Sequence, residues 1–247
     1  SSWTSSQISL NDLLMVGPTV QEELYSTLIR FRFHKFVITA DIEKMYRQVL
    51  VGDNDRNFQL ILWRQNPSDS LQVYRLNTVT YGTSSAPFLA IRCLNHLSDL
   101  YKESLPIGAK IIRSDFYVDD LLTGADSFQE LLTIRDQVTQ ILSSAGLNLT
   151  KWFSNHPDFN ISNCKEKLLH NDSDSAKALG IHWVPKNDSF KFYLEDNFND
   201  LKATKRNILS VSSRLFDPLG LLCPIITKSK MLLQELWIQK LDWDESI

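Results

Sequence analysis

Cysteine and histidine are scarce in this 247-residue sequence, and neither type is grouped in a way that marks a metal site. The three cysteines, Cys93, Cys164 and Cys223, lie far apart and match no zinc-ligand spacing. The five histidines include no His-x-x-x-His pair. We therefore expect no zinc site and no disulfide framework, and we expect free thiols in a reducing compartment.

Long apolar runs and an excess of one charge are missing as well. No apolar run approaches the roughly 18 residues that a membrane span requires. The start shows no signal-peptide pattern, so we expect no membrane association. The net charge is −3 and the pI is about 6.0. A local basic channel and a local acidic site cancel in such a sum, so bulk charge neither supports nor excludes nucleic-acid binding.

The length and a composition of 43% hydrophobic and 22% charged residues suit one large globular domain or two small ones. Apolar spacing predicts alternating strands and helices. Strands are expected over 35–40, 58–63, 72–79, 111–118 and 121–124, and helices over 19–30, 86–100 and 127–146. In the last of these helices, Ser127 and Glu130 have the spacing of a capping box. This order predicts an α+β fold, an antiparallel sheet with helices packed on one face.

The C-terminal third is more polar and its elements are shorter. Strands are expected over 177–184 and 190–194, and a helix is expected from about residue 196 to Leu215. Asp217–Gly220 breaks this helix, and a last helix is expected around Met231–Trp237. A soft domain boundary is placed near 175–195.

Two adjacent aspartates, Asp119 and Asp120, fall in a predicted hairpin turn between apolar strands. An isolated pair in a turn is usually solvated, because aspartate is common there. A third aspartate, Asp41, ends a strand that has the pattern of a buried one. If the two strand ends are neighbours, three carboxylates converge and repel one another by several kcal/mol unless cations neutralise them.

Hard divalent cations are the natural partners of such a carboxylate group, and Mg²⁺ is the usual choice near phosphates. Two such ions, about 3.5–4 Å apart, stabilise the attacking and leaving oxygens of phosphoryl transfer. The residues alone therefore predict metal-assisted nucleotidyl or phosphodiester chemistry. They do not separate a polymerase from a nuclease.

Three segments resemble reverse transcriptases. Tyr117–Asp120 (Tyr-Val-Asp-Asp) resembles their catalytic hairpin, Val37–Tyr46 resembles their first palm motif, and Tyr81–Phe88 resembles the loop-to-helix motif that follows. Further segments are similar to the BEL/Pao class of long-terminal-repeat retrotransposons, namely Ser9–Asp12, Asp41–Arg47, Phe216–Gly220 and the Leu-Gln-Glu-Leu-Trp run at 233–237. The resemblance covers nearly the whole chain, with its motifs in the expected order.

The resemblance implies roles for these residues. Asp41, Asp119 and Asp120 would hold two Mg²⁺ ions, with Mn²⁺ as an alternative. Tyr46 resembles the steric gate that favours deoxynucleotides, and its alternative is a core aromatic. The substrate-binding residues implied are Tyr46, Tyr81, Gly82, Tyr117, Leu179 and Gly180. Tyr81 and Gly82 would line the nascent base pair, although many relatives have glutamine before this glycine.

Three further assignments have a plainer alternative. Lys151 matches a lysine that protonates the leaving pyrophosphate, or it is a solvated charge. The segment around Leu179 and Gly180 resembles the primer grip, or it contains a glycine bulge in a strand. Three basic residues of the predicted thumb helix would follow template or primer phosphates, or would form a solvated helix face: Lys202, Lys205 and Arg206.

The architecture implied is the right hand of a polymerase. Residues 1–35 would form partial fingers and the entry to the palm, and 36–175 the palm with a fingers insertion at about 53–80. Residues 176–247 would form the primer-grip hairpin and a helical thumb or connection. Basic fingers residues precede Ser9–Asp12 in relatives, so part of the fingers is expected to be missing.

The function implied is that of an RNA-directed DNA polymerase. Its partners would be an RNA or DNA template with a primer and deoxynucleoside triphosphates, in the cytoplasm within virus-like particles. The protease, RNase H and integrase of the parent polyprotein are expected outside this chain. Two alternatives are a retroelement remnant that binds nucleic acid or protein without catalysis, and a two-metal nuclease.

Overall fold

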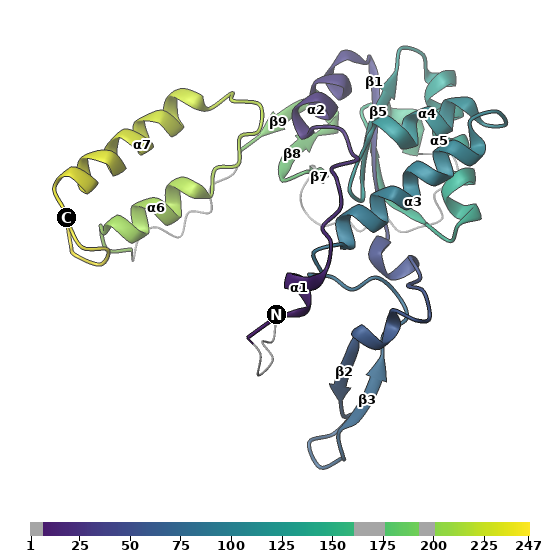
Figure 1. The fold of residues 1–247 in the computed structure, drawn as a ribbon. Helices are drawn as coiled ribbons and strands as arrows, with labels where there is room; N and C mark the ends of the chain where they lie inside the picture. The colour runs from purple at the N-terminus through teal and green to yellow at the C-terminus, as the bar shows by residue number, and fades with distance from the viewer. Residues whose placement is uncertain (1–6, 161–175, 193–200) are drawn as a thin grey trace. The chain divides into compact units, whose positions relative to one another are not determined.

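The computed structural model describes residues 7–160, 176–192 and 201–247 (Figure 1). The chain divides into two compact units, residues 1–168 and 169–247. Cys164 and the expected start of a helix near 196 lie outside the described residues. Within the described ranges, no helix is long and apolar enough to cross a bilayer.

A four-stranded antiparallel sheet forms the centre of the first unit. Its order is β4 (Phe116–Tyr117), β5 (Asp120–Ala125), β1 (Phe36–Ile42) and β6 (Leu149–Ser154). Strand β1 pairs with β5 on one side and β6 on the other, so it is central and its residues are mostly buried. The predicted antiparallel α+β arrangement is therefore confirmed.

Three helices supply most of the core that covers this sheet: α3 (Ala86–Tyr101), α4 (Pro106–Ser114) and α5 (Phe128–Ser144) (Figure 1). The alternate residues Ile38, Ala40 and Ile42 of β1 belong to the same core cluster. Successive side chains of a strand point to opposite faces. Asp41 is therefore on the face of β1 opposite the one that packs in this core.

Two helices precede the sheet in the chain. The short helix α1 spans Leu10–Leu13, and α2 spans Leu24–Phe33 and packs beside β4 and β5. Helix α2 was expected over 19–30, but it begins only at Leu24, after an extended Glu23. Four 3-10 turns complete the described elements: η1 (Met45–Gln48), η2 (Arg56–Phe58), η3 (Pro157–Asn160) and η4 (Pro185–Asn187).

The predicted strand over 111–118 is wrong in its first part, which belongs to helix α4, and correct only at Phe116–Tyr117, which form β4. Pro106 starts this helix at a position that tolerates proline. Gly108 then lets the helix approach α5 so closely that a Cβ there would lie 2.7 Å from Cβ of Gln137. Tertiary packing of the buried Ala109 and Ile112 outweighs the strand propensity of the isoleucines.

The hairpin of β2 (Leu60–Trp63) and β3 (Gln72–Arg75) agrees with the predicted pair of strands, although β3 is shorter than expected. All eight residues of the two strands are exposed. The backbone bridge between Leu50 and Thr78 connects the hairpin to the rest of the unit.

The described residues of the second unit, 176–192 and 201–247, form a three-stranded antiparallel sheet and two helices. The strands are β7 (Ala176–Ala178), β8 (Ile181–Val184) and β9 (Ser189–Lys191). The helices α6 (Lys205–Ser213) and α7 (Cys223–Ile238) pack against each other. The single strand expected over 177–184 is interrupted by a turn, and α6 begins later than the sequence predicted.

Candidate active site

The three aspartates lie at one edge of the four-stranded sheet. Asp41 pairs with Asp120 across β1 and β5, and with Thr150 across β1 and β6. The backbone N–H of Ile42 donates to the carbonyl oxygen of Asp119 at 2.9 Å. Register and this hydrogen bond therefore place the end of β1 next to the turn of the β4–β5 hairpin.

The hairpin turn has a strained backbone. Tyr117 pairs with Asp120, so Val118 and Asp119 form the turn, one residue earlier than the sequence predicted. Val118 has a φ of 56°, a left-handed conformation that is unfavourable for a β-branched residue. Its N–H donates to Oε1 of Gln21 at 3.3 Å. Strain of this kind costs about 1–3 kcal/mol and persists only where surrounding contacts hold it.

Electrostatics connect Asp119 to its neighbours. Burial raises the pKa of Asp119 above its ordinary value, and the negative charge of Asp41 adds to the rise. A hydrogen bond from its own backbone and the positive charge of Lys151 oppose this rise. Asp119 thus lies within electrostatic range of both Asp41 and Lys151.

Lys151 makes an ion pair with Asp41. Its Nζ donates to Oδ2 of Asp41, and this hydrogen bond is the main cause that raises the pKa of Lys151. Lys151 itself has a φ of 53°, and its side chain is 71% exposed against 22% for Asp41. The pair is therefore at the open edge of the sheet.

The donor set at this edge fits hard divalent ions, because its groups are carboxylate oxygens. As the side chains are placed, no group of three or more acidic, histidine or cysteine residues in the described ranges converges on one point. Oδ2 of Asp41 is directed to Lys151.

Tyr46 and Tyr81 form an aromatic pair beside the aspartates. Their ring centroids are 4.9 Å apart with an interplanar angle of 71°, an edge-to-face arrangement. Burial raises the pKa of Tyr46, and the charge of Asp119 contributes. Tyr46 therefore lies near both Asp119 and the loop that follows Tyr81. Gly82 has a φ of 82°, with open space where a Cβ would be, so its backbone conformation rather than a close contact favours glycine.

Asn11 holds this loop, a contact that the sequence analysis did not identify. Its Nδ2 donates to the carbonyl oxygen of Gly82 at 2.9 Å, and its Oδ1 accepts from the N–H of Ser84 at 3.0 Å. The available indication was the resemblance of Ser9–Asp12 to a family motif. In the structure, a capping box between Ser9 and Asp12 orders the short helix that carries Asn11.

Leu179 and Gly180 belong to the second unit, so they are described apart from the aspartates. They form the two-residue turn between β7 and β8, with φ values of 53° and 80°. Positive φ at both positions is typical of a type I′ hairpin turn. The glycine is therefore part of a turn and not of the bulge that was one of the two alternatives.

Lys205 is buried, with 4% of its surface exposed. Its Nζ donates to the carbonyl oxygen of Leu241 and lies 4.2 Å from the ring centroid of Trp237 and 5.2 Å from that of Trp243. The predicted roles for this residue, following phosphates or facing solvent, are both wrong. Burial between two indole rings with a carbonyl partner accounts for its position.

Arg206 pairs with Asp244 through two hydrogen bonds of 2.7 and 3.0 Å. Both residues are exposed at their side chains, 60% and 72%. Arg206 thus has an acidic partner in the same unit.

Comparison with protein families gives two matches. Residues 18–182 match the family described as reverse transcriptase (RNA-dependent DNA polymerase). Residues 204–247 match the Pao retrotransposon-like RNaseH-like domain. Comparison with curated protein sequences gives no match. The second match corrects the expectation that the RNase H segment lies outside this chain, because the residues that match a domain with that description include α6 and α7.

The first match covers two thirds of the chain and includes all three aspartates, Tyr46, Tyr81 and Lys151. The second match adds the retrotransposon class. The chain therefore belongs to the reverse transcriptase family and represents the reverse transcriptase region of a BEL/Pao retrotransposon, followed by a segment that matches the Pao RNaseH-like domain.

Proposed function

We propose that this chain is the catalytic core of an RNA-directed DNA polymerase that adds deoxynucleotides to a primer 3′-OH. The observation that carries the proposal is the register of Asp41 with Asp120, with Asp119 hydrogen-bonded to the end of the same strand. The sheet and helices α3–α5 serve as the palm, and the β2–β3 hairpin as the fingers insertion. Residues 176–247 supply the primer-grip turn at Leu179 and Gly180 and a helical thumb or connection, whose helices α6 and α7 fall in the segment that matches the Pao RNaseH-like domain.

In this proposal Asp41, Asp119 and Asp120 hold two Mg²⁺ ions. Bound there, the ions would supply charge neutralisation for phosphoryl transfer. The protein's contribution is to fix the positions of the three carboxylates through the β1–β5 pairing and the hairpin turn.

Lys151 supplies a proton in this scheme. A lysine side chain is protonated at neutral pH, and the hydrogen bond with Asp41 raises the pKa of Lys151 further. Because it lies beside the carboxylates, we assign it the transfer of a proton to the leaving pyrophosphate. Lys151→Gln removes the proton and tests this role by slowing the chemical step.

In this proposal, Tyr46 selects deoxynucleotides over ribonucleotides. It lies near Asp119 and is half-buried against Tyr81, so its ring has a defined place beside the proposed reaction centre. A ring in that place crowds the 2′ position of a ribonucleotide. Tyr81 and Gly82 line the nascent base pair in the same scheme, and Tyr117 is a further substrate-binding residue.

Primer extension on a poly-rA template with dTTP and Mg²⁺ tests the proposal. Asp119→Asn is expected to abolish synthesis, whereas Asp136→Asn, an exposed aspartate on α5, should retain it. Wild-type synthesis by Asp119→Asn would overturn the metal assignment. Nucleotide binding without synthesis would favour a non-catalytic remnant, and cleavage of a labelled duplex without nucleotides would favour a nuclease.

A further inference from the structure

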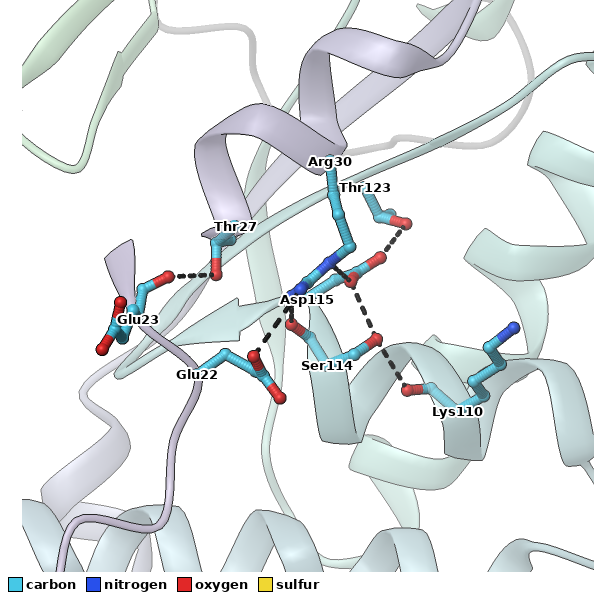
Figure 2. A network of polar contacts seen from close by, with 8 residues as sticks. All are labelled: Glu22, Glu23, Thr27, Arg30, Lys110, Ser114, Asp115 and Thr123. Carbon is cyan, nitrogen blue, oxygen red and sulfur yellow. Dashed lines mark hydrogen bonds and ion pairs between the residues drawn. The ribbon is translucent and has the colours of Figure 1, made fainter. Parts of the chain in front are cut away.

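Asp115 is a buried carboxylate directly before the hairpin that carries Asp119. It is 5% exposed and ends helix α4. Its Oδ2 accepts from Oγ1 of Thr123 at 2.7 Å, and its Oδ1 accepts from Oγ of Ser114 at 2.8 Å and from Nε of Arg30 at 3.3 Å. Figure 2 shows this carboxylate between Arg30 and Thr123. Both oxygens therefore have donors, and the donors come from three different elements.

Arg30 connects helix α2 to the same place by a second contact. Its guanidinium also donates to the carbonyl oxygen of Ser114, and its Nη1 lies 3.7 Å from Oε2 of Glu22 (Figure 2). The guanidinium is planar and presents several donors in a fixed geometry. Arg30 thus fixes the end of α4 through both the Asp115 side chain and the Ser114 backbone.

The carboxylate of Asp115 bridges the two sides of the hairpin base. Asp115 precedes β4, and Thr123 lies within β5, where it pairs with Ile38 of the central strand. The backbone N–H of Leu122 donates to the carbonyl oxygen of Asp115 at 3.0 Å, next to the side-chain contact. The base of the hairpin is therefore closed by one backbone and one side-chain hydrogen bond.

The segment that leads into α2 also reaches the other end of the hairpin. Gln21 accepts the N–H of Val118 at the strained turn, while Arg30, from the same helical region, holds Asp115 at the base. Asp119 directly follows the anchored Val118 and precedes Thr123, the residue of β5 that donates to Asp115. Its position relative to Asp41 therefore depends on contacts made by the α2 region.

A buried ion pair is weak evidence for stability, because desolvation offsets the attraction between the charges. The ion pair has a clearer effect on geometry than on stability. A carboxylate with three donors has one arrangement that satisfies all of them. We propose that Arg30, Asp115 and Thr123 form a positioning network that sets the catalytic hairpin against strand β1. This inference rests on the proposed polymerase function, and none of the three is expected to touch the substrate.

The test compares Arg30→Met, Arg30→Lys and Thr123→Val. Thr123→Val preserves the side-chain shape and removes the hydroxyl donor, and Arg30→Lys preserves the charge and removes the planar fork. A displacement of about 1 Å at reacting groups costs on the order of 100-fold in rate, so we expect kcat to fall about 10- to 100-fold in Arg30→Met and Thr123→Val. We expect the KM for dTTP to stay near the wild-type value and Arg30→Lys to restore part of kcat.

Arg113→Met is the matched control. Arg113 pairs with Asp99 and donates to Oγ of Ser98 at 3.3 Å and to the carbonyl oxygen of Asn95 at 3.1 Å, so it connects α4 to α3. It has the same chemistry as Arg30, but its hydrogen bonds and ion pair within the described residues go to α3 and not to the hairpin strands. We expect this variant to lose stability without the selective fall in kcat.

Amide hydrogen exchange provides a readout that does not require activity. Arg30→Met should accelerate exchange at Leu122 and Val118, whose N–H groups donate to Asp115 and Gln21, and Arg113→Met should not. Equal changes in the two variants, or a raised KM with unchanged kcat, would refute the positioning role. If the wild type synthesises no DNA while exchange changes as expected, the network stands and the proposed polymerase function fails.

Discussion

Removing the amide of Asn11 should disturb nucleotide selection more than it disturbs folding. Asn11→Ala deletes the 2.9 Å and 3.0 Å hydrogen bonds to Gly82 and Ser84. Each such bond contributes about 0.5–1.5 kcal/mol, so the loss is about 1–3 kcal/mol. The loop that it releases carries Tyr81, whose ring packs edge-to-face on Tyr46.

The expected kinetic effect follows from that magnitude. At about 1.4 kcal/mol for each factor of ten, a loss of 1–3 kcal/mol lowers kcat/KM for dTTP by about 5- to 160-fold. Because Tyr46 is the proposed sugar gate, kcat/KM for the ribonucleotide should fall less, and discrimination should weaken. Single-nucleotide incorporation with a dTTP series and a UTP series measures both values.

Asn155→Ala is a close control for this experiment. Asn155 makes the same kind of two-sided contact, accepting from the N–H of Val37 at 2.9 Å and donating to the carbonyl oxygen of Lys35 at 3.0 Å. These partners lie at the start of β1, and Asp41 lies near its end. We expect similar losses of unfolding free energy from both variants and a kinetic change from Asn11→Ala alone. Equal kinetic effects, or unchanged discrimination in Asn11→Ala, would refute the reasoning.

Three further predictions concern stability. Gly108→Ala should cost about 1–3 kcal/mol in urea unfolding, because the new Cβ would lie 2.7 Å from Cβ and 2.9 Å from the backbone carbonyl carbon of Gln137, and the backbone of α5 cannot move aside as a flexible side chain does. Ser127→Ala should cost about 1 kcal/mol by the same assay, because its side chain accepts the N–H of Glu130 at the start of α5; Ser127→Asn should retain most of that contribution. Lys205→Met should shift the fluorescence of Trp237 and Trp243, whose rings lie beside the Lys205 ammonium group. It should also lower the unfolding free energy of the second unit by about 2 kcal/mol. An unchanged fluorescence spectrum would exclude the contact with the indole rings.

Local patterns predicted the features that depend on neighbouring residues in the chain. The spacing of buried positions located β1, α3 and α5, and the Ser127 and Glu130 spacing located the start of α5. The same reasoning predicted that Asp41 ends a strand and that Asp119 lies in a hairpin turn. These expectations succeeded because periodicity, capping and turn chemistry act over a few residues.

Long-range contacts decided the remainder. Residues 111–114 are helical because α5 packs on Gly108. The Gly108 N–H donates to the side chain of Gln137, which lies 29 residues further along the chain. Likewise, Asn11 and Ser84 are 73 residues apart, and Arg30 and Asp115 are 85 apart. Neither pair has a local pattern that would identify it.

The sequence by itself therefore determined the family motifs, the α+β class and the carboxylates at the ends of strands. Only the tertiary structure decided how those carboxylates are held: the register that places Asp41 opposite Asp120, the ion pair that directs Asp41 to Lys151, and the Asp115 network behind the hairpin. The physical reason is that strand register and buried hydrogen bonds depend on partners brought together by folding, and an amino-acid pattern specifies each partner without specifying the pairing.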